Sequence, residues 1–117
     1  RLDAVGPGDE VITPGFTYIA TAETVALLHA KPAYVDIDAR TYNLDPALLE
    51  AAITPRTKVI LPVHLYGQPV DLGPLLALAR RHDLWVLEDG AQAHGACYKE
   101  QRLGAHGDAV AWSFYPG

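Results

Sequence analysis

An apolar run in the middle of the chain ends in two carboxylates, and an amide follows shortly after them. The run 84–87 leads directly into Glu88 and Asp89, and Gln92 stands three residues after the second acid. Parallel α/β sheets bind their ligands at the carboxyl ends of buried strands of this kind. An acid at such a strand end has to be paired or hydrogen-bonded. Asp89 therefore suits either a cationic ligand, such as a protonated ring nitrogen, or a structural role as an N-cap or an acceptor of loop amides.

The two neighbouring acids are expected to face opposite sides of the sheet, because successive side chains of a strand alternate. Glu88 and Asp89 are then not expected to share one ligand, which disfavours a hydrolytic mechanism with two carboxylates. Three further candidates each have a structural alternative. Gln92 faces the same ligand or is a solvated loop amide, and Tyr18 stacks on a planar ligand or caps the core. Ser113 binds a phosphate through its hydroxyl or is an ordinary strand serine.

Fingerprints of several other chemistries are absent from the sequence. There is no G-x-G-x-x-G after the first predicted strand, no Walker sequence and no G-x-S-x-G. The five histidines include no pair at helical ligand spacing, and the lone Cys97 excludes a thiolate cluster. The sequence therefore predicts no metal site, and a metal-dependent hydrolase is a remote alternative.

Composition indicates one globular domain in a reducing compartment. The 117 residues are 50% hydrophobic and 20% charged, with a net charge of −5. Basic residues are scattered, so no electrostatic footprint for nucleic acid is present. No apolar run reaches the length of a membrane span and no signal-peptide pattern occurs. A single cysteine cannot form an internal disulfide, so we expect a cytoplasmic protein.

The hydrophobic pattern predicts an α/β fold, with a mostly parallel sheet and flanking helices. Short runs typical of strands recur about every 25 residues, the spacing of strand-helix units with short loops. Two of the middle runs are continuously apolar, as in strands that are covered on both faces. The predicted strands are 10–13, 33–36, 58–62, 84–88 and 109–114.

Helices are predicted between most of these strands. A first helix covers 20–30 and ends at Lys31-Pro32, and a second begins at Asp45-Pro46. A third carries an apolar stripe over 72–79, with Asp71 as its N-cap. The interval after Glu88 has no helical stripe but several glycines and a possible hairpin at 98–102. A loop that replaces a crossover helix is usually functional.

Five motifs have the order and spacing of a known family. They are GDEVI at 8–12, PGFTYIAT at 14–21, PVHLYG at 62–67, EDGAQAHG at 88–95 and SFYPG at 113–117. The chain resembles the DegT/StrS-type family of sugar aminotransferases, which depend on pyridoxal 5'-phosphate (PLP). The resemblance covers nearly the whole chain. It implies a fold-type I enzyme, built like aspartate aminotransferase.

The resemblance also implies roles for individual residues. Asp89 matches the acid that pairs with the pyridinium nitrogen, where an anion keeps the ring protonated and able to accept carbanion charge. Gln92 matches the residue beside the ring hydroxyl, Tyr18 the aromatic stacked on the ring, and Ser113 a hydroxyl that helps to hold the phosphate. His64 lies in an aligned motif but receives no chemical role beyond bracing the strand end.

Parts of the family's machinery have no counterpart in the 117 residues. The Schiff-base lysine is expected immediately after Gly117, and Lys31, Lys58 and Lys99 lie outside its motif. No catalytic residue is therefore expected within the chain. Residues 1–117 are expected to be the central part of a PLP-binding large domain, without its N-terminal part, its lysine segment and its small C-terminal domain. The isolated chain is expected to be inactive.

The resemblance predicts transfer of an amino group, with glutamate as donor, onto a keto-sugar that is linked to a nucleotide. It implies small-molecule partners and a homodimer, with no nucleic acid or membrane. One alternative is a dehydratase of the same family, in which histidine replaces the lysine. Another is a non-catalytic relative that serves in binding or regulation, against which the intact Asp89, Gln92 and Ser113 argue.

Overall fold

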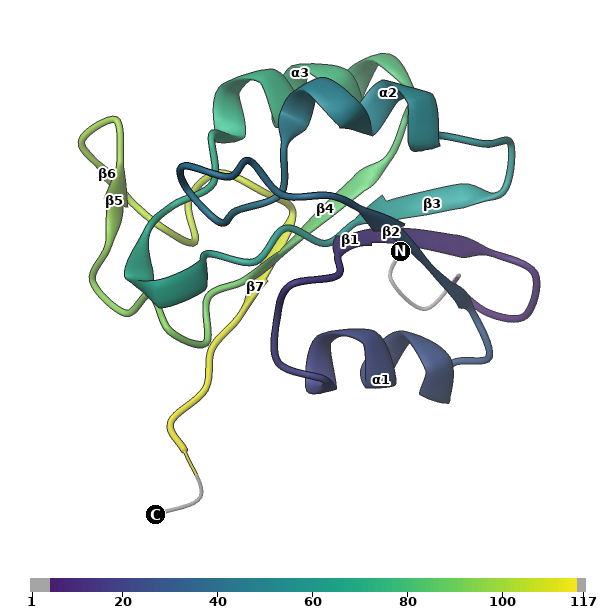
Figure 1. Ribbon diagram of the computed structural model, residues 1–117, viewed down its shortest axis with the longest axis horizontal. Helices are drawn as coiled ribbons and strands as arrows, with labels where there is room; N and C mark the ends of the chain where they lie inside the picture. Colours follow the sequence, from purple (N-terminus) through teal and green to yellow (C-terminus); the bar gives the residue numbers. More distant parts are fainter. Residues whose placement is uncertain (1–4, 116–117) are drawn as a thin grey trace.

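A five-stranded parallel sheet forms the centre of the structure, a computed structural model that describes residues 5–115 (Figure 1). The strand order is β2-β1-β3-β4-β7, and every neighbouring pair is parallel. The predicted α/β class and all five predicted strands are confirmed, with ends that differ by a few residues. The strands are β1 (Glu10–Pro14), β2 (Lys31–Val35), β3 (Thr57–Ile60), β4 (Trp85–Asp89) and β7 (Ala109–Ala111).

Helices cover both faces of this sheet (Figure 1). Helix α1 (Ala20–Leu27) lies on one face, and α2 (Leu49–Ala52) and α3 (Leu72–Arg81) lie on the other. A short 3-10 turn, η2 (Pro46–Leu48), leads into α2 and begins where the Asp45 carboxylate accepts the Ala47 N–H. Among residues 5–115, no helix has the length and apolar character that a membrane crossing requires.

The core consists of two apolar layers, because side chains of each strand alternate between the faces. Ile12, Ile60 and Val86 face α2 and α3, whereas Val11 and Val59 face α1. All five of these side chains are buried. The continuous apolar runs seen in the sequence are thus explained by burial on both sides of the central strands.

The first helix is shorter than predicted. It ends at Leu27, and His29 adopts a left-handed conformation with φ of 58°. Lys31 and Pro32 do not terminate the helix but begin β2. The proline fits there because, within residues 5–115, β2 is an edge strand that pairs with β1 alone, so its missing N–H costs no ladder hydrogen bond.

Asp71 is the N-cap residue of α3, as predicted, but a side chain from a distant hairpin makes the hydrogen bond to the first turn of the helix. The hairpin of β5 (Cys97–Tyr98) and β6 (Gln101–Arg102) matches the turn predicted at 98–102. The Tyr98 hydroxyl accepts the Gly73 N–H at 3.0 Å and donates to Asp71 Oδ1 at 2.5 Å. Asp71 makes no cap hydrogen bond of its own. The predicted cap position is confirmed, whereas the hydrogen bond to the first turn of the helix comes from Tyr98, 25 residues away from Gly73.

Tyr98→Phe is expected to lower the free energy of unfolding by about 1 kcal/mol, because the substitution leaves the Gly73 N–H without an acceptor. Urea denaturation measures the change. Tyr34→Phe removes the hydroxyl of an exposed tyrosine on β2 and serves as the control. Equal stability of the two variants would show that the Tyr98 hydroxyl does not cap α3.

Candidate functional site

Side chains from four segments of the chain line one cavity at the carboxyl ends of the central strands. Its volume is about 460 Å³, within the range of small-molecule sites. All four residues predicted to hold a ligand line it, namely Tyr18, Asp89, Gln92 and Ser113. The other lining residues are Thr17, Ala20, Thr21, Val63, Leu65, Ala91 and Tyr115.

Asp89 is the last residue of β4 and is half-buried at this cavity. Its Oδ2 accepts a hydrogen bond from Thr21 Oγ1 at 2.9 Å, and its Oδ1 accepts the Ala91 N–H at 3.0 Å. A carboxylate has about four acceptor positions, so both oxygens can accept a further bond from a ligand. These two contacts fix the carboxylate without using up its acceptor capacity.

The amide of Gln92 has a fixed orientation. Its Oε1 accepts the backbone N–H of Tyr66 at 2.9 Å, which identifies the oxygen because that backbone group can only donate. Tyr66 lies in the short turn η3 (Leu65–Gly67) and has a left-handed φ of 57°. With the oxygen engaged, the two N–H groups of Gln92 are the ones left for a ligand.

Tyr18 and Ser113 complete the set of predicted ligand residues. Tyr18 stands just before α1, and its side chain is 77% exposed, so its ring is available to a planar ligand. Ser113 follows β7 by two residues, and its Oγ accepts the Tyr115 N–H at 3.3 Å. The predicted motif continues to Pro116 and Gly117, and these residues and the lysine expected after them lie outside the described residues.

Thr21 also lines the cavity, although its sequence context predicted no role for it. It lies in the first turn of α1, is 5% exposed, and donates to Asp89 across 68 residues of sequence. Thr17 Oγ1 lies 3.3 Å from Thr21 Oγ1. The sequence does show two threonines at i and i+4 after the Pro14-Gly15 turn. It contains no local feature that indicates Asp89 as the acceptor of the Thr21 hydroxyl.

Glu88 points to the opposite face, as the strand alternation predicted. It is fully buried, and its Oε2 lies 2.8 Å from His64 Nε2 while Oε1 accepts the Gly107 N–H at 2.6 Å. Burial alone would raise the pKa of Glu88, but the hydrogen bonds from His64 and Gly107 hold it below its ordinary value. Glu88 is therefore a carboxylate in the folded protein and belongs to the core, not to the cavity.

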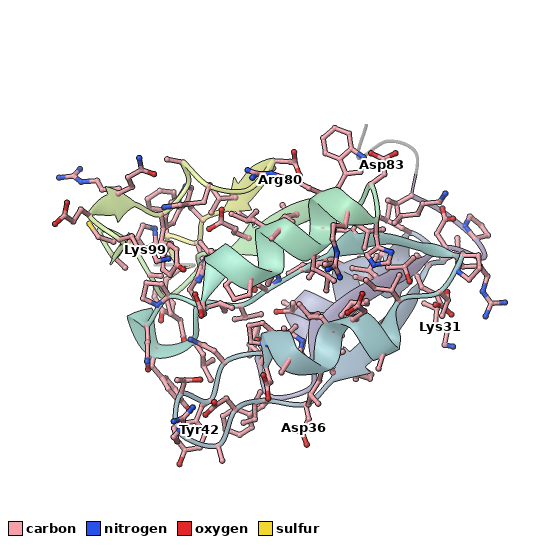
Figure 2. All side chains as sticks on the ribbon, turned by 90° about the horizontal axis from the view of Figure 1, so that it is seen from above. Lys31, Asp36, Tyr42, Arg80, Asp83 and Lys99 are labelled. Atoms are coloured by element: carbon pink, nitrogen blue, oxygen red, sulfur yellow. The ribbon has the colours of Figure 1, made fainter. Side chains whose placement is uncertain are left out.

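Other polar residues that follow strands of the sheet lie elsewhere. Asp36 and Asp38 follow β2 but do not line the cavity, and Figure 2 shows Asp36 on an outer edge of the molecule. Figure 2 also places Lys31 and Lys99 on opposite sides of the protein. Lys58 is likewise absent from the cavity lining, so the lysines of the chain do not reach this site.

The fold and the cavity define an α/β domain with a cavity where its parallel strands end, the place where such sheets bind their ligands. The chain belongs to the DegT/DnrJ/EryC1/StrS aminotransferase family, which it matches over residues 1–117. The resemblance drawn from the five sequence motifs is thereby confirmed, and so is the family's mostly parallel α/β fold.

A relative from Pseudomonas aeruginosa, UDP-2-acetamido-2-deoxy-3-oxo-D-glucuronate aminotransferase, is 64% identical over 112 residues. The match covers 96% of this chain and 31% of the relative. The crystal structure of S. venezuelae DesV in complex with a ketimine intermediate superposes with a TM-score of 0.93 at 53% identity, covering 96% of this chain and 30% of that one. The putative sugar aminotransferase Spr1654 from Streptococcus pneumoniae, in its PLP-form, superposes with a TM-score of 0.90 at 38% identity. The match covers 95% of this chain and 32% of that one. The chain therefore spans about a third of the length of these proteins.

Proposed function

We propose that these residues form part of the cofactor-binding large domain of a PLP-dependent aminotransferase. The reaction transfers an amino group from glutamate to a keto-sugar that is linked to a nucleotide. One observation carries the proposal: Asp89, Gln92, Tyr18 and Ser113, predicted from the family motifs, line a single cavity. Relatives whose names specify amino transfer to a nucleotide-linked oxo-sugar support the substrate class.

The residues of the cavity fit PLP in size and in chemistry. Asp89 offers acceptor positions to a protonated ring nitrogen, and Gln92 offers N–H groups to a ring oxygen. Tyr18 offers an exposed aromatic face, and Ser113 a hydroxyl for the phosphate. The bound cofactor would supply an electron sink for the amino-acid carbon.

Asp89 would control the protonation of the cofactor ring in this arrangement. Its carboxylate would hold the proton on the ring nitrogen, and each unit by which it raises that pKa corresponds to about 1.4 kcal/mol. Thr21 and Ala91 keep the carboxylate in place through their hydrogen bonds to its two oxygens. The charge is therefore already oriented before a ligand arrives, which avoids a cost of reorganisation on binding.

We also propose that the full-length protein is a cytoplasmic homodimer. The family resemblance supports the dimer, and the single Cys97 is in keeping with a reducing compartment. The proposed partners are small molecules, the amino donor and the keto-sugar.

The direct test uses the full-length protein with added PLP. We expect visible absorbance that persists through dialysis, and transfer of the amino group of glutamate to a UDP-linked 3-oxo-sugar. A protein that retains no PLP at concentrations well above ordinary cofactor affinities would refute the cofactor assignment. Retention of PLP without transfer to any of a panel of nucleotide-linked keto-sugars would refute the substrate class.

Thr21→Val is expected to weaken PLP binding by about tenfold, because it removes one partly buried hydrogen bond to the Asp89 carboxylate. Thr24→Val is the matched control, since Thr24 lies on the same helix and its hydroxyl bonds only the Thr21 carbonyl. Dissociation constants come from absorbance titration of each purified variant. An unchanged constant for Thr21→Val would show that the hydroxyl does not support Asp89.

A further inference from the structure

A fully buried histidine and carboxylate lie directly behind the cavity, and the proposed function gives them no role. His64 and Glu88 each have a side-chain exposure of 0%. Such groups are costly to bury unless all of their polar atoms are paired. Every polar side-chain atom of His64 and Glu88 has a hydrogen-bond partner. The pair is therefore an integral part of the structure at the strand ends.

The hydrogen bonds determine the protonation state of the pair. His64 Nδ1 accepts the Val70 N–H at 3.0 Å, so this nitrogen carries no proton. Nε2 must then carry the proton that it donates to Glu88 Oε2 at 2.8 Å. The other oxygen of Glu88 accepts the Gly107 N–H. The pair is therefore a neutral imidazole beside an anionic carboxylate, and each partner has a defined orientation.

The backbone of His64 pairs with the strand end that carries the site. The His64 N–H donates to the Asp89 carbonyl at 3.0 Å, and the Asp89 N–H donates to the Pro62 carbonyl at 2.8 Å. These bonds extend the pairing of β3 and β4 past the end of β3, up to the residue whose side chain faces the cavity. Glu88 directly precedes Asp89 in β4. A displacement of the Glu88 carboxylate would therefore also displace this strand end.

The imidazole also anchors the turn that orients Gln92. Its bond to Val70 fixes one end of the segment 64–70, and the buried Asn43 accepts the Leu65 N–H at 3.1 Å. Within this segment, Tyr66 presents its N–H to Gln92 Oε1. A shift of His64 would therefore move both the strand end at Asp89 and the turn that holds Gln92.

We propose that His64 and Glu88 are positioning residues for the ligand of the cavity. Through the ends of β3 and β4 and the turn at 64–70, they aim the Asp89 carboxylate and the Gln92 amide at a bound pyridine ring. This role rests on the proposed function. It concerns residues that touch neither cofactor nor substrate.

The substitution Glu88→Gln tests whether Glu88 positions the site or only stabilises the fold as a buried carboxylate. The variant amide has one oxygen for two donors, His64 Nε2–H and Gly107 N–H, and His64 cannot reverse its ring because Val70 needs Nδ1. Glu10→Gln is the matched control. Glu10 is also buried, at 3% exposure, but it lies at the opposite end of the sheet and bonds Thr54, Lys31 and Arg56.

The full-length protein and both variants are titrated with PLP by absorbance, at a temperature at which all three are folded. We expect Glu88→Gln to raise the dissociation constant by about tenfold, the equivalent of one lost buried hydrogen bond, and to shift the visible absorbance maximum. Glu10→Gln is expected to bind as the wild type does, whatever its stability. Equal dissociation constants and spectra for Glu88→Gln and Glu10→Gln would overturn the proposal.

If Glu88→Gln does not fold, two substitutions of His64 test the positioning role instead. His64→Gln keeps a donor for Glu88, and His64→Asn keeps an acceptor for Val70. Each is expected to bind PLP more weakly than the wild type and with an altered spectrum. Binding indistinguishable from the wild type in both would overturn the positioning role alone. Failure of the wild type itself to bind PLP would instead refute the proposed function.

Discussion

Asp89→Asn is expected to lower the kcat/KM for amino transfer by about 100-fold in the full-length protein. Loss of one member of a buried, hydrogen-bonded charge pair costs about 3 kcal/mol, and each 1.36 kcal/mol is a factor of ten in rate. The substitution preserves shape, since the amide oxygen can still accept the Ala91 N–H. The Thr21 hydroxyl can turn to accept from the new amide. The effect is therefore one of charge, not of folding.

A matched control for this variant is Asp36→Asn. Asp36 also follows a strand of the same sheet, but it is exposed, and its carboxylate accepts only the neighbouring Ile37 N–H. We expect it to retain wild-type kcat/KM. The absorbance spectrum of bound PLP provides a second readout, because it responds to protonation of the ring. An Asp89→Asn protein with wild-type spectrum and a rate within about threefold of wild type would refute the assigned role.

The sheet could be predicted from the sequence because burial on both faces leaves a local signal. Continuous apolar runs such as 84–87 identify the central strands without any knowledge of their neighbours. The position of Asp89 at a strand end and the opposite direction of Glu88 both follow from the alternation of a strand. The juxtaposition of Asp89 with Gln92 needed only the parallel order of the strands and the short distance between the two residues.

Contacts that join distant segments could not be predicted in this way. Thr21 and Asp89 are 68 residues apart, and Tyr98 accepts the Gly73 N–H in the first turn of α3 from 25 residues away. His64 was expected only to brace the strand end, and its bonds to Glu88 and Val70 depend on the packing of three segments. Propensity and periodicity describe how an element forms, whereas these contacts depend on where the elements meet.

Gly107→Ala is expected to lower the free energy of unfolding by about 2–3 kcal/mol, the upper part of the range for overpacked interiors. An added Cβ would lie 2.9 Å from Glu88 Oε1 and 2.9 Å from the Val86 carbonyl oxygen. The carbonyl cannot move aside, because it belongs to β4 and accepts the Asp108 N–H at 2.9 Å. The loop would have to withdraw instead, and the hydrogen bond from Gly107 to Glu88 would break.

Gly6→Ala is the control for this prediction, because nothing lies within 4 Å of a Cβ added at Gly6. Urea denaturation of both variants gives the change in stability. Equal stability of Gly107→Ala and Gly6→Ala would show that the loop at Gly107 does not lie as close to Glu88 as the structure places it.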